Sequence, residues 1–490
     1  MRRLREEPRV TPSASSGSDE REPETTHWRG LAILVAGAFF MENLDATIIA
    51  TAAPKMAESL GVRSIDINVA IAVYVLMLAV FIPVSGWLSD RFGSRTVFVV
   101  AIGIFTLASG LCALSTSLLE LTVLRACQGI GGAMMVPVGR LVVLRHAGKH
   151  DVINAIAYLT WPGLAAPVLA PVIGGSLTTY ASWRWIFVIN LPLGAIAVGV
   201  ALWLVPNARE ATQHALDYIG FALTGVGLAT LVYSLELLSA ETINWTRATV
   251  ALTTGAVMLT FDIRHLRRTA HPLFDLDLLR IATYRVAVAG GTVFRIAIGA
   301  VPFLLPLLFQ NEFGWTPLKS GLLVMVVFIG NIVIKPVTTP LLRSFGFQRV
   351  LVVAATAGAV TIALCALIGP TTPTALDCAV LFAGGVFRSI GFTAYNTIGF
   401  ADIPLASLVS ANSLIATVTQ LATGLAVTIG AIMLRLGGPL SRLFGLSGSG
   451  ADAFTAALIL ISLVALVPVV QSWRLHPDAG LRISSRPPPR

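Results

Sequence analysis

Apolar blocks of about 20 residues recur along almost the whole sequence, and this repetition most constrains what the chain can fold into. A helix of about 20 apolar residues crosses the ~30 Å hydrocarbon core of a bilayer. Hydrophobic residues make up 55% of the chain and charged residues 12%, which is more apolar surface than one soluble core can bury. The segment 322–334, LLVMVVFIGNIVI, is apolar on every face, whereas barrel strands alternate apolar and polar residues. We therefore predict an all-α polytopic protein whose surroundings are the lipid bilayer.

Fourteen blocks are long and apolar enough to be predicted as membrane-spanning helices. Their predicted bounds are 29–53, 68–89, 96–114, 118–139, 154–177, 185–205, 217–238, 247–263, 285–310, 320–342, 350–369, 374–396, 409–434 and 453–473. Residues 1–28, before the first span, mix charges of both signs with Pro and Ser. Such a composition cannot form a core and predicts a disordered tail. Because the number of spans is even, both ends of the chain lie on one side of the membrane.

The distribution of basic residues predicts which side that is. When a cation at the first residue of a span is counted with the connection before it, the two ends and the connections on their side hold 23 Lys and Arg residues, against 7 in the opposite connections and 4 inside the spans. Loops rich in Lys and Arg stay in the cytoplasm, so both termini are predicted to be cytoplasmic. These residues are scattered without interleaved aromatic side chains, which disfavours a nucleic acid as partner.

A short internal repeat suggests two related halves. Pro83 and Pro336 lie 253 residues apart, and so do Gly93 and Gly346, within the similar segments RFGSR and SFGFQ. Two six-helix bundles plus two additional central-insert helices would account for 14 spans; a chance match is the alternative explanation of so short an echo. The predicted domains are a disordered cytoplasmic tail (1–28), an N-terminal six-helix bundle (29–205), a linker with two extra transmembrane helices (206–284), a C-terminal six-helix bundle (285–473) and a cytoplasmic C-terminal tail (474–490).

Two carboxylates stand within the first span. Glu42 and Asp45 are three residues apart and therefore neighbours on one helical face. A carboxylate at the centre of a membrane helix costs about 2.5–3.5 kcal/mol on insertion scales, so it should face a cavity or a partner. Opening and closing a cavity around such a group can load and release a proton. Arg125 in the fourth span is the predicted cationic partner. The alternatives are acids wetted at the outer interface and an arginine that extends to the surface.

Three cations lie inside spans of the second half: Arg295, Lys335 and Arg388. Cations at this depth imply a polar cavity. They either attract an anionic group of a substrate or pair with acids and backbone carbonyls across the bundle.

The segment GWLSDRFGSR connects the second and third spans with almost no slack. Gly86 is predicted to permit close helix packing and Gly93 a tight turn. Asp90 is placed to accept from helix N-termini, while Arg91 and Arg95 hold the cytoplasmic face. A contact that exists in only one arrangement of the halves biases the switch between them, so we predict a conformational gate; a charged turn that only fixes topology is the alternative.

The fifth span is interrupted by prolines and glycines. These are Pro162, Gly163, Pro167, Pro171, Gly174 and Gly175. Each interior proline frees a backbone carbonyl and bends the helix, so this span is predicted to act as a hinge or as a tight seal between the halves. A static kink is the alternative.

These segments together resemble the major facilitator superfamily, and more narrowly its 14-helix drug:proton antiporter branch of the EmrB/QacA type. The first span matches LDxTIxxxAxP at Leu44, Asp45, Thr47, Ile48, Ala53 and Pro54. The connection after the second span matches G-x-L-x-D-R-x-G-x-R, and the fourth span matches RxxQGxGGA from Arg125 to Ala133. The fifth span is similar to the antiporter signature, with Ala166 and Ala170 where the branch usually has glycine. The pairing of GGAMMVPVGR with NTIGFADIPLASLVSANSL resembles the MdtD-like subgroup.

The resemblance implies a major facilitator fold and a proton-coupled exporter of drugs or other amphipathic small molecules in a bacterial cytoplasmic (inner) membrane. It implies that Asp45 titrates and that Arg125 takes part in proton transfer. Transport would proceed by alternating access, driven by a proton gradient without a cofactor. The implied partners are the small-molecule substrate, protons and lipid, and the chain is expected to work as a monomer.

Polar, aromatic and flexible side chains within the spans are predicted to line the central cavity, because such groups suit amphipathic ligands. The candidates are Phe40, Tyr74, Gln128, Met134, Trp161, Arg295, Lys335, Arg388 and Tyr395. As ordinary core or lipid-facing residues they would need no function.

Two alternative functions are a transporter of a defined metabolite and a membrane-embedded enzyme. The three cations of the second half favour export or uptake of a defined metabolite, such as an organic anion or an amino acid. A membrane-embedded enzyme is disfavoured, because the sequence has no metal cluster, nucleophile motif or nucleotide loop such as G-x-x-x-x-G-K-[ST]. No catalytic or metal-binding residue is therefore predicted.

Overall fold

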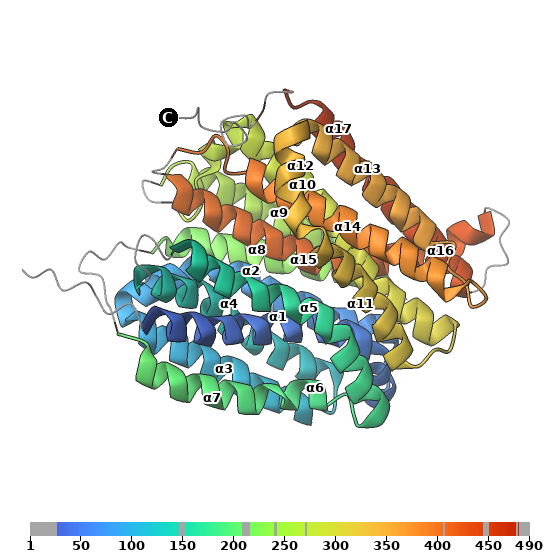
Figure 1. Cartoon of the computed structure of the whole chain (residues 1–490), viewed down its shortest axis with the longest axis horizontal. Helices are drawn as coiled ribbons and strands as arrows, with labels where there is room; N and C mark the ends of the chain where they lie inside the picture. Colours follow the sequence, from blue (N-terminus) through green and yellow to red (C-terminus); the bar gives the residue numbers. More distant parts are fainter. Residues whose placement is uncertain are drawn as a thin grey trace, which may run out of the picture.

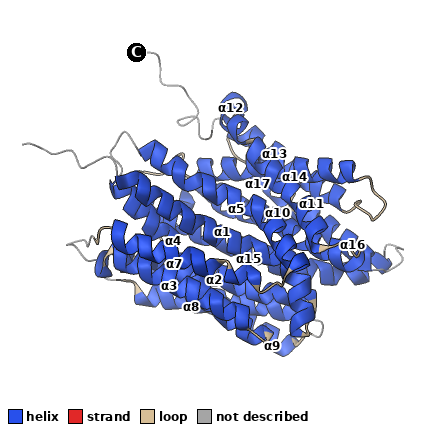
Figure 2. Ribbon diagram, turned by 60° about the horizontal axis from the view of Figure 1, so that its bottom comes forward, coloured by secondary structure: helices blue, strands red, loops and turns tan. Residues whose placement is uncertain are grey.

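The computed structural model describes residues 27–146, 152–207, 216–239, 243–269, 272–404, 407–443, 450–476 and 479. This described part of the chain consists of helices joined by short connections and contains no strand (Figure 2). The predicted tails, 1–28 and 474–490, lie almost entirely outside the described residues.

Each of the fourteen predicted spans is helical. The first half comprises α1 (His27–Leu60), η1 (Ser64–Ile67), α2 (Asn68–Phe92), α3 (Ser94–Leu114), α4 (Leu118–His146), α5 (Val152–Tyr180), α6 (Trp185–Val188) and α7 (Asn190–Leu204). The central pair is α8 (Tyr218–Ser239) and α9 (Trp245–Leu266). The second half comprises η2 (Leu276–Arg280), α10 (Ala282–Leu307), η3 (Leu308–Glu312), α11 (Pro317–Val333), α12 (Lys335–Phe345), α13 (Phe347–Cys365), α14 (Thr374–Ile398), α15 (Leu408–Leu443), α16 (Gly450–Val464) and α17 (Val467–Trp473).

Eleven of the described helices are long and apolar enough to cross a membrane by length and composition, or twelve when α11 and α12 count as one span. The span predicted at 320–342 is therefore not one straight helix, since its axis bends by 51° between α11 and α12. Pro336 stands at the start of α12, and a proline removes a helical hydrogen bond and disfavours the helical conformation of the residue before it. The span predicted at 453–473 likewise divides into α16 and α17, with Pro468 at the start of α17.

The helices form two bundles, as expected from the sequence (Figure 1). In the first, α1 packs against α4 and α5, and α3 packs against α4 and α7. In the second, α14 packs against α10, α11 and α13, and α15 packs against α10 and α16. The pair α8 and α9 pack on each other, and α8 also contacts α2 and α15. The predicted all-α architecture of two bundles with two additional helices is confirmed for the described residues.

The two bundles meet through α5 with α11, and α2 with α15. We call the end of the molecule where α1 begins and α17 finishes the terminal end, and the opposite end the distal end. Near the distal end, a Cβ on Gly175 would lie 2.6 Å from the Pro317 carbonyl oxygen, and one on Gly321 2.1 Å from that of Pro171. Only glycine permits such an approach of two backbones, so the halves are tightly joined at the distal end.

The internal repeat appears as a shared turn. Gly93 links α2 to α3 with φ of 94°, and Gly346 links α12 to α13 with φ of 76°. Residues with a side chain avoid this region of backbone conformation, so the tight turn predicted at Gly93 is confirmed and occurs twice. The prolines differ, because Pro83 lies within an unbroken α2 while Pro336 begins α12.

Candidate functional site

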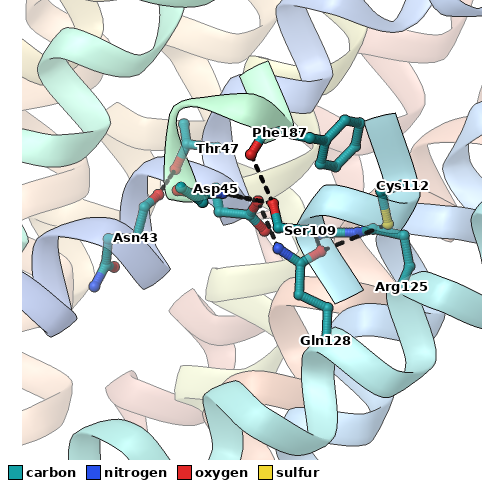
Figure 3. A network of polar contacts seen from close by, with 9 residues as sticks. Asn43, Asp45, Thr47, Ser109, Cys112, Arg125, Gln128 and Phe187 are labelled. Atoms are coloured by element: carbon teal, nitrogen blue, oxygen red, sulfur yellow. Dashed lines mark hydrogen bonds and ion pairs between the residues drawn. The ribbon is translucent and has the colours of Figure 1, made fainter. Parts of the chain in front are cut away.

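Asp45 is the centre of a fully buried polar network whose side chains come from four helices, α1, α3, α4 and α7 (Figure 3). Arg125 Nη1 of α4 donates to Asp45 Oδ2, and neither side chain is exposed to solvent. Gln128 Nε2 and Asn190 Nδ2 donate to Asp45 Oδ1, at 2.9 Å and 3.0 Å. The buried carboxylate therefore has a cation and two amide donors to stabilise its charge.

Local helix geometry brings the donors from α4 together. Arg125 and Gln128 are three residues apart and share a face of the helix, and Gln128 Oε1 accepts from Arg125 Nη1 at 2.7 Å. A Cβ on Gly129 would lie 2.5 Å from the Tyr74 carbonyl oxygen, so this glycine lets α4 approach α2. The Arg125 guanidinium carbon consequently lies 3.9 Å from the centre of the Tyr74 ring, a cation–π contact.

Two members of the network were not predicted from the sequence. Asn190 Nδ2 also donates to Ser109 Oγ at 2.9 Å, and Ser109 Oγ donates to the Phe187 carbonyl oxygen at 3.0 Å. Asn190 stood in the segment WRWIFVINLPLG, where an amide inside an apolar run was a usable signal. Ser109 gave none, because a small hydroxyl in a membrane helix commonly bonds its own backbone.

Glu42 is placed differently from Asp45, although both lie on α1. Its side chain is only 7% exposed, borders a cavity, and its Oε2 has no hydrogen-bond partner among the described residues. Three residues along a helix correspond to a rotation of about 60°. Asp45 thus faces the network with α4, while Glu42 faces the space between the halves.

That space is a cavity of about 310 Å³ with walls from α1, α2, α5, α10, α11, α14 and α15. Glu42 lies on the wall of the first half, and Arg295 and Arg388 lie on the wall of the second. None of the described residues of α8 or α9 lines it. The central cavity is thus built by the two bundles alone and carries charge of both signs.

The three predicted cations of the second half have no acidic partner in the part of the chain that the structure describes. Arg295 Nη2 donates to Asn396 Oδ1 at 2.5 Å, and Lys335 Nζ donates to Thr393 Oγ1 at 3.1 Å. Arg388 instead lies against two aromatic rings and leaves Nε and Nη1 without hydrogen-bond partners among described residues. Lys335 does not line the cavity in this conformation, and it begins α12 directly after the break from α11.

Several predicted cavity residues are packed elsewhere. Tyr74 and Gln128 belong to the Asp45 network, and Met134 is buried in the core of the first half. Phe40 packs against the hydrophobic core, while Tyr395 is buried with its hydroxyl 3.1 Å from Ser472 Oγ. These side chains do not line the observed cavity. The side chain of Trp161 lies outside the described residues.

Polar residues that the sequence reasoning missed take their place. They are Asn43, Thr47, Asn396, Thr419, Gln420 and Thr423. Thr419 and Thr423 are four residues apart in α15 and therefore share one face of that helix, so polar residues at helical spacing were the available signal.

The predicted gate residues lie at the turn between α2 and α3. Arg91 stacks on the Trp87 ring at 5.5 Å, and Arg95 Nη1 donates to the Leu202 carbonyl oxygen at 3.5 Å. Asp90 is half-buried. The close packing predicted at Gly86 does not occur in this conformation, since nothing lies within 4 Å of a Cβ placed there.

In the fifth span, α5 is one continuous helix despite Pro162, Pro167 and Pro171. Its glycines permit close contacts, because a Cβ on Gly163 would lie 2.3 Å from the Phe39 ring and one on Gly174 would lie 3.1 Å from the Ile48 carbonyl oxygen. The contacts of Gly163 and Gly174 lie within the first bundle, and that of Gly175 with Pro317 joins the two halves. The role of α5 as a hinge or a seal stays a prediction.

Residues 35–427 match the family model of the Major Facilitator Superfamily. Among curated relatives, the Putative multidrug resistance protein MdtD of Enterobacter sp. (strain 638) is 36% identical over 454 residues, covering 91% of this chain and 94% of that protein. The MdtD protein of Escherichia coli O157:H7 (strain EC4115 / EHEC) is 39% identical over 420 residues, covering 85% and 88%.

Solved structures of low sequence identity share the fold. A bacterial homologue of the human lysosomal transporter Spinster, in an inward-facing and unoccupied conformation, matches with a TM-score of 0.62, 14% identity and 95% and 99% coverage. A D-xylose–proton symporter matches with a TM-score of 0.64, 13% identity and 92% and 98% coverage. The chain is therefore a multi-pass membrane transporter of small molecules that belongs to the Major Facilitator Superfamily, as an MdtD-like member.

Proposed function

We propose that this chain is a proton-driven exporter of amphipathic small molecules, drugs among them, in a bacterial cytoplasmic membrane. One observation carries the proposal, namely the buried Asp45–Arg125 pair within about one helical turn of a cavity that both bundles line. A buried ion pair of this kind is costly to keep and is strongly unbalanced when either charge is removed. Proton uptake by Asp45 would release Arg125 and so favour a different arrangement of the helices.

The geometry between the bundles supports alternating access. At the distal end, Gln310 Nε2 donates to the Thr51 carbonyl oxygen at 3.0 Å, and Gly175 lies against the Pro317 backbone. Both contacts join the two halves and would have to separate for the cavity to open distally. With the terminal end in the cytoplasm, as the distribution of Lys and Arg favours, this is a conformation closed to the outside.

Reconstituted protein tests the coupling. Proteoliposomes loaded in turn with cationic ethidium and with an anionic amphipathic dye should expel at least one of them when a pH gradient is imposed, and dissipating the gradient with a protonophore should stop export. Export that proceeds equally without a gradient would remove proton coupling from the proposal. Fluorescence of green fluorescent protein fused to the C-terminus in cells reports a cytoplasmic end, and its absence with intact expression would reverse the topology.

The MdtD relatives are named as putative multidrug resistance proteins, which favours export over uptake here. We propose that the monomer is the transporting unit, because the cavity and the Asp45 network are complete within one chain.

A further inference from the structure

The buried cations of the two halves differ in whether they have a carboxylate partner, and this difference indicates the charge of the substrate. Arg125 has a carboxylate partner, whereas Arg295 and Arg388 border the cavity without one among the described residues. A buried guanidinium without a counter-charge is unfavourable, and most of all inside a membrane protein. Such groups are retained where a ligand supplies the missing charge.

Both arginines gather around one aromatic side chain. The guanidinium carbons of Arg388 and Arg295 lie 5.0 Å and 5.9 Å from the centre of the Phe392 ring, and Arg388 also lies 5.5 Å from that of Phe328. Arg388, Phe392 and Asn396 follow one another at intervals of four residues on α14 and therefore form one stripe. The stripe presents charge, an aromatic face and an amide to the same cavity.

The charge balance of the cavity favours an anion. Its lining holds two arginines and a single carboxyl group, Glu42, on the opposite wall. The cavity is thus net positive whether Glu42 is ionised or protonated, and no described ion pair joins Glu42 to either arginine. A cationic ligand would meet two like charges, while an oxyanion would meet donors that fit it well.

From these observations we infer that the cavity binds amphipathic organic monoanions, with the carboxylate or equivalent oxyanion held by Arg388 and Arg295 and the apolar body against Phe328 and Phe392. The inference names the substrate class of the exporter proposed above and rests on that function only for the direction of transport. Binding itself requires no gradient, so the two proposals can fail separately.

The test uses three probes with one ring system: 2-naphthoate, 2-naphthamide and 2-naphthylmethylammonium. Binding to the purified full chain in detergent micelles is measured by isothermal titration calorimetry. We expect 2-naphthoate to bind at least tenfold tighter than the other two. Arg388→Gln should weaken 2-naphthoate at least tenfold and change 2-naphthamide less than twofold. Arg295→Gln should show the same selectivity, which keeps the test independent of the folding of one variant.

Arg280→Gln is the matched control, since it removes one positive charge from an arginine whose side chain is 84% exposed and lies outside the cavity. It should leave all three affinities unchanged. The inference is overturned if the amide or the ammonium probe binds as tightly as 2-naphthoate, if no probe binds, or if Arg280→Gln weakens 2-naphthoate as much as Arg388→Gln does. Gradient-driven export of a dye in spite of such a result would leave the proposed exporter in place without its anionic substrate class.

Discussion

The first and second bundles share a backbone plan but not an arrangement of charge. In the first, the buried cation Arg125 pairs with Asp45 and donates to Gln128, and two amide side chains, Gln128 and Asn190, donate to Asp45. In the second, Arg295 and Arg388 border the cavity with no carboxylate against them in the described residues. A carboxylate within a paired network is suited to exchanging a proton. Cations without a carboxylate partner are suited to binding an anionic ligand reversibly. Under the proposed function, the first bundle would serve proton coupling and the second would bind the substrate.

The largest effect should come from breaking the network at its carboxylate. Asp45→Asn keeps the shape and can still pair with Gln128, but an amide cannot exchange a proton. We expect gradient-driven export to fall about 100-fold or to background, measured as initial efflux from proteoliposomes. Asp277→Asn, at a carboxylate 72% exposed on η2, is the matched control and should export normally. Undiminished export by Asp45→Asn would remove this residue from the coupling step.

The next prediction compares how much stability the protein loses when a buried arginine is replaced in each bundle. Arg125→Met leaves the buried Asp45 charge unpaired, which should lower the free energy of unfolding by about 3–5 kcal/mol. Adding Asp45→Asn to that variant should restore part of the loss, because neither charge then remains. Arg388→Met should change stability little, since no carboxylate is abandoned. Thermal unfolding in micelles, followed by tryptophan fluorescence, compares them, and equal losses at Arg125 and Arg388 would refute the contrast between bundles.

Much of the first-half site could be predicted because polar residues inside apolar runs are conspicuous. Asp45, Arg125 and Gln128 each interrupt a membrane helix, where a charged or amide side chain must find a partner. The helical structure of the fourteen apolar runs was predictable from their lengths, although the breaks within some of them were not. The turn at Gly93 was predictable because glycine alone tolerates its backbone conformation.

The sequence could not specify contacts between helices or the exact direction of a side chain. Ser109 and Asn190 meet Asp45 only through packing of α3 and α7 against the rest of the bundle. The sequence placed Glu42 and Asp45 on one helical face. In the structure, the rotation of about 60° between them directs Glu42 to the cavity and Asp45 to the network. Lys335 does not line the cavity and begins α12 directly after the 51° bend from α11, a bend that the apolar pattern did not predict.

A smaller effect should distinguish the donors within the first-half network. Asn190→Ala removes a hydrogen bond to a charged group, which should lower the free energy of unfolding by about 1.5–3 kcal/mol. Ser109→Ala loses bonds between neutral groups and should cost about 0.5–1.5 kcal/mol. Thermal unfolding of both variants measures the difference. If Ser109→Ala proved the more harmful, Asn190 would be a packing residue and Asp45 would rely on Arg125 and Gln128 alone.

The last effect is comparable in size to that of Asn190→Ala and concerns the glycine turn that the two halves share. Gly93→Ala and Gly346→Ala each force a side chain into a backbone conformation that favours glycine, at a cost on the order of 1–3 kcal/mol. Gly86→Ala, in a helix with open space around it, should be neutral or slightly stabilising. Similar losses of thermal stability at Gly93 and Gly346 would show that the turn is one structural device used twice. A loss at Gly93 alone would mean that the backbone at Gly346 can relax to accept a side chain. The shared turn would then constrain the first bundle but not the second.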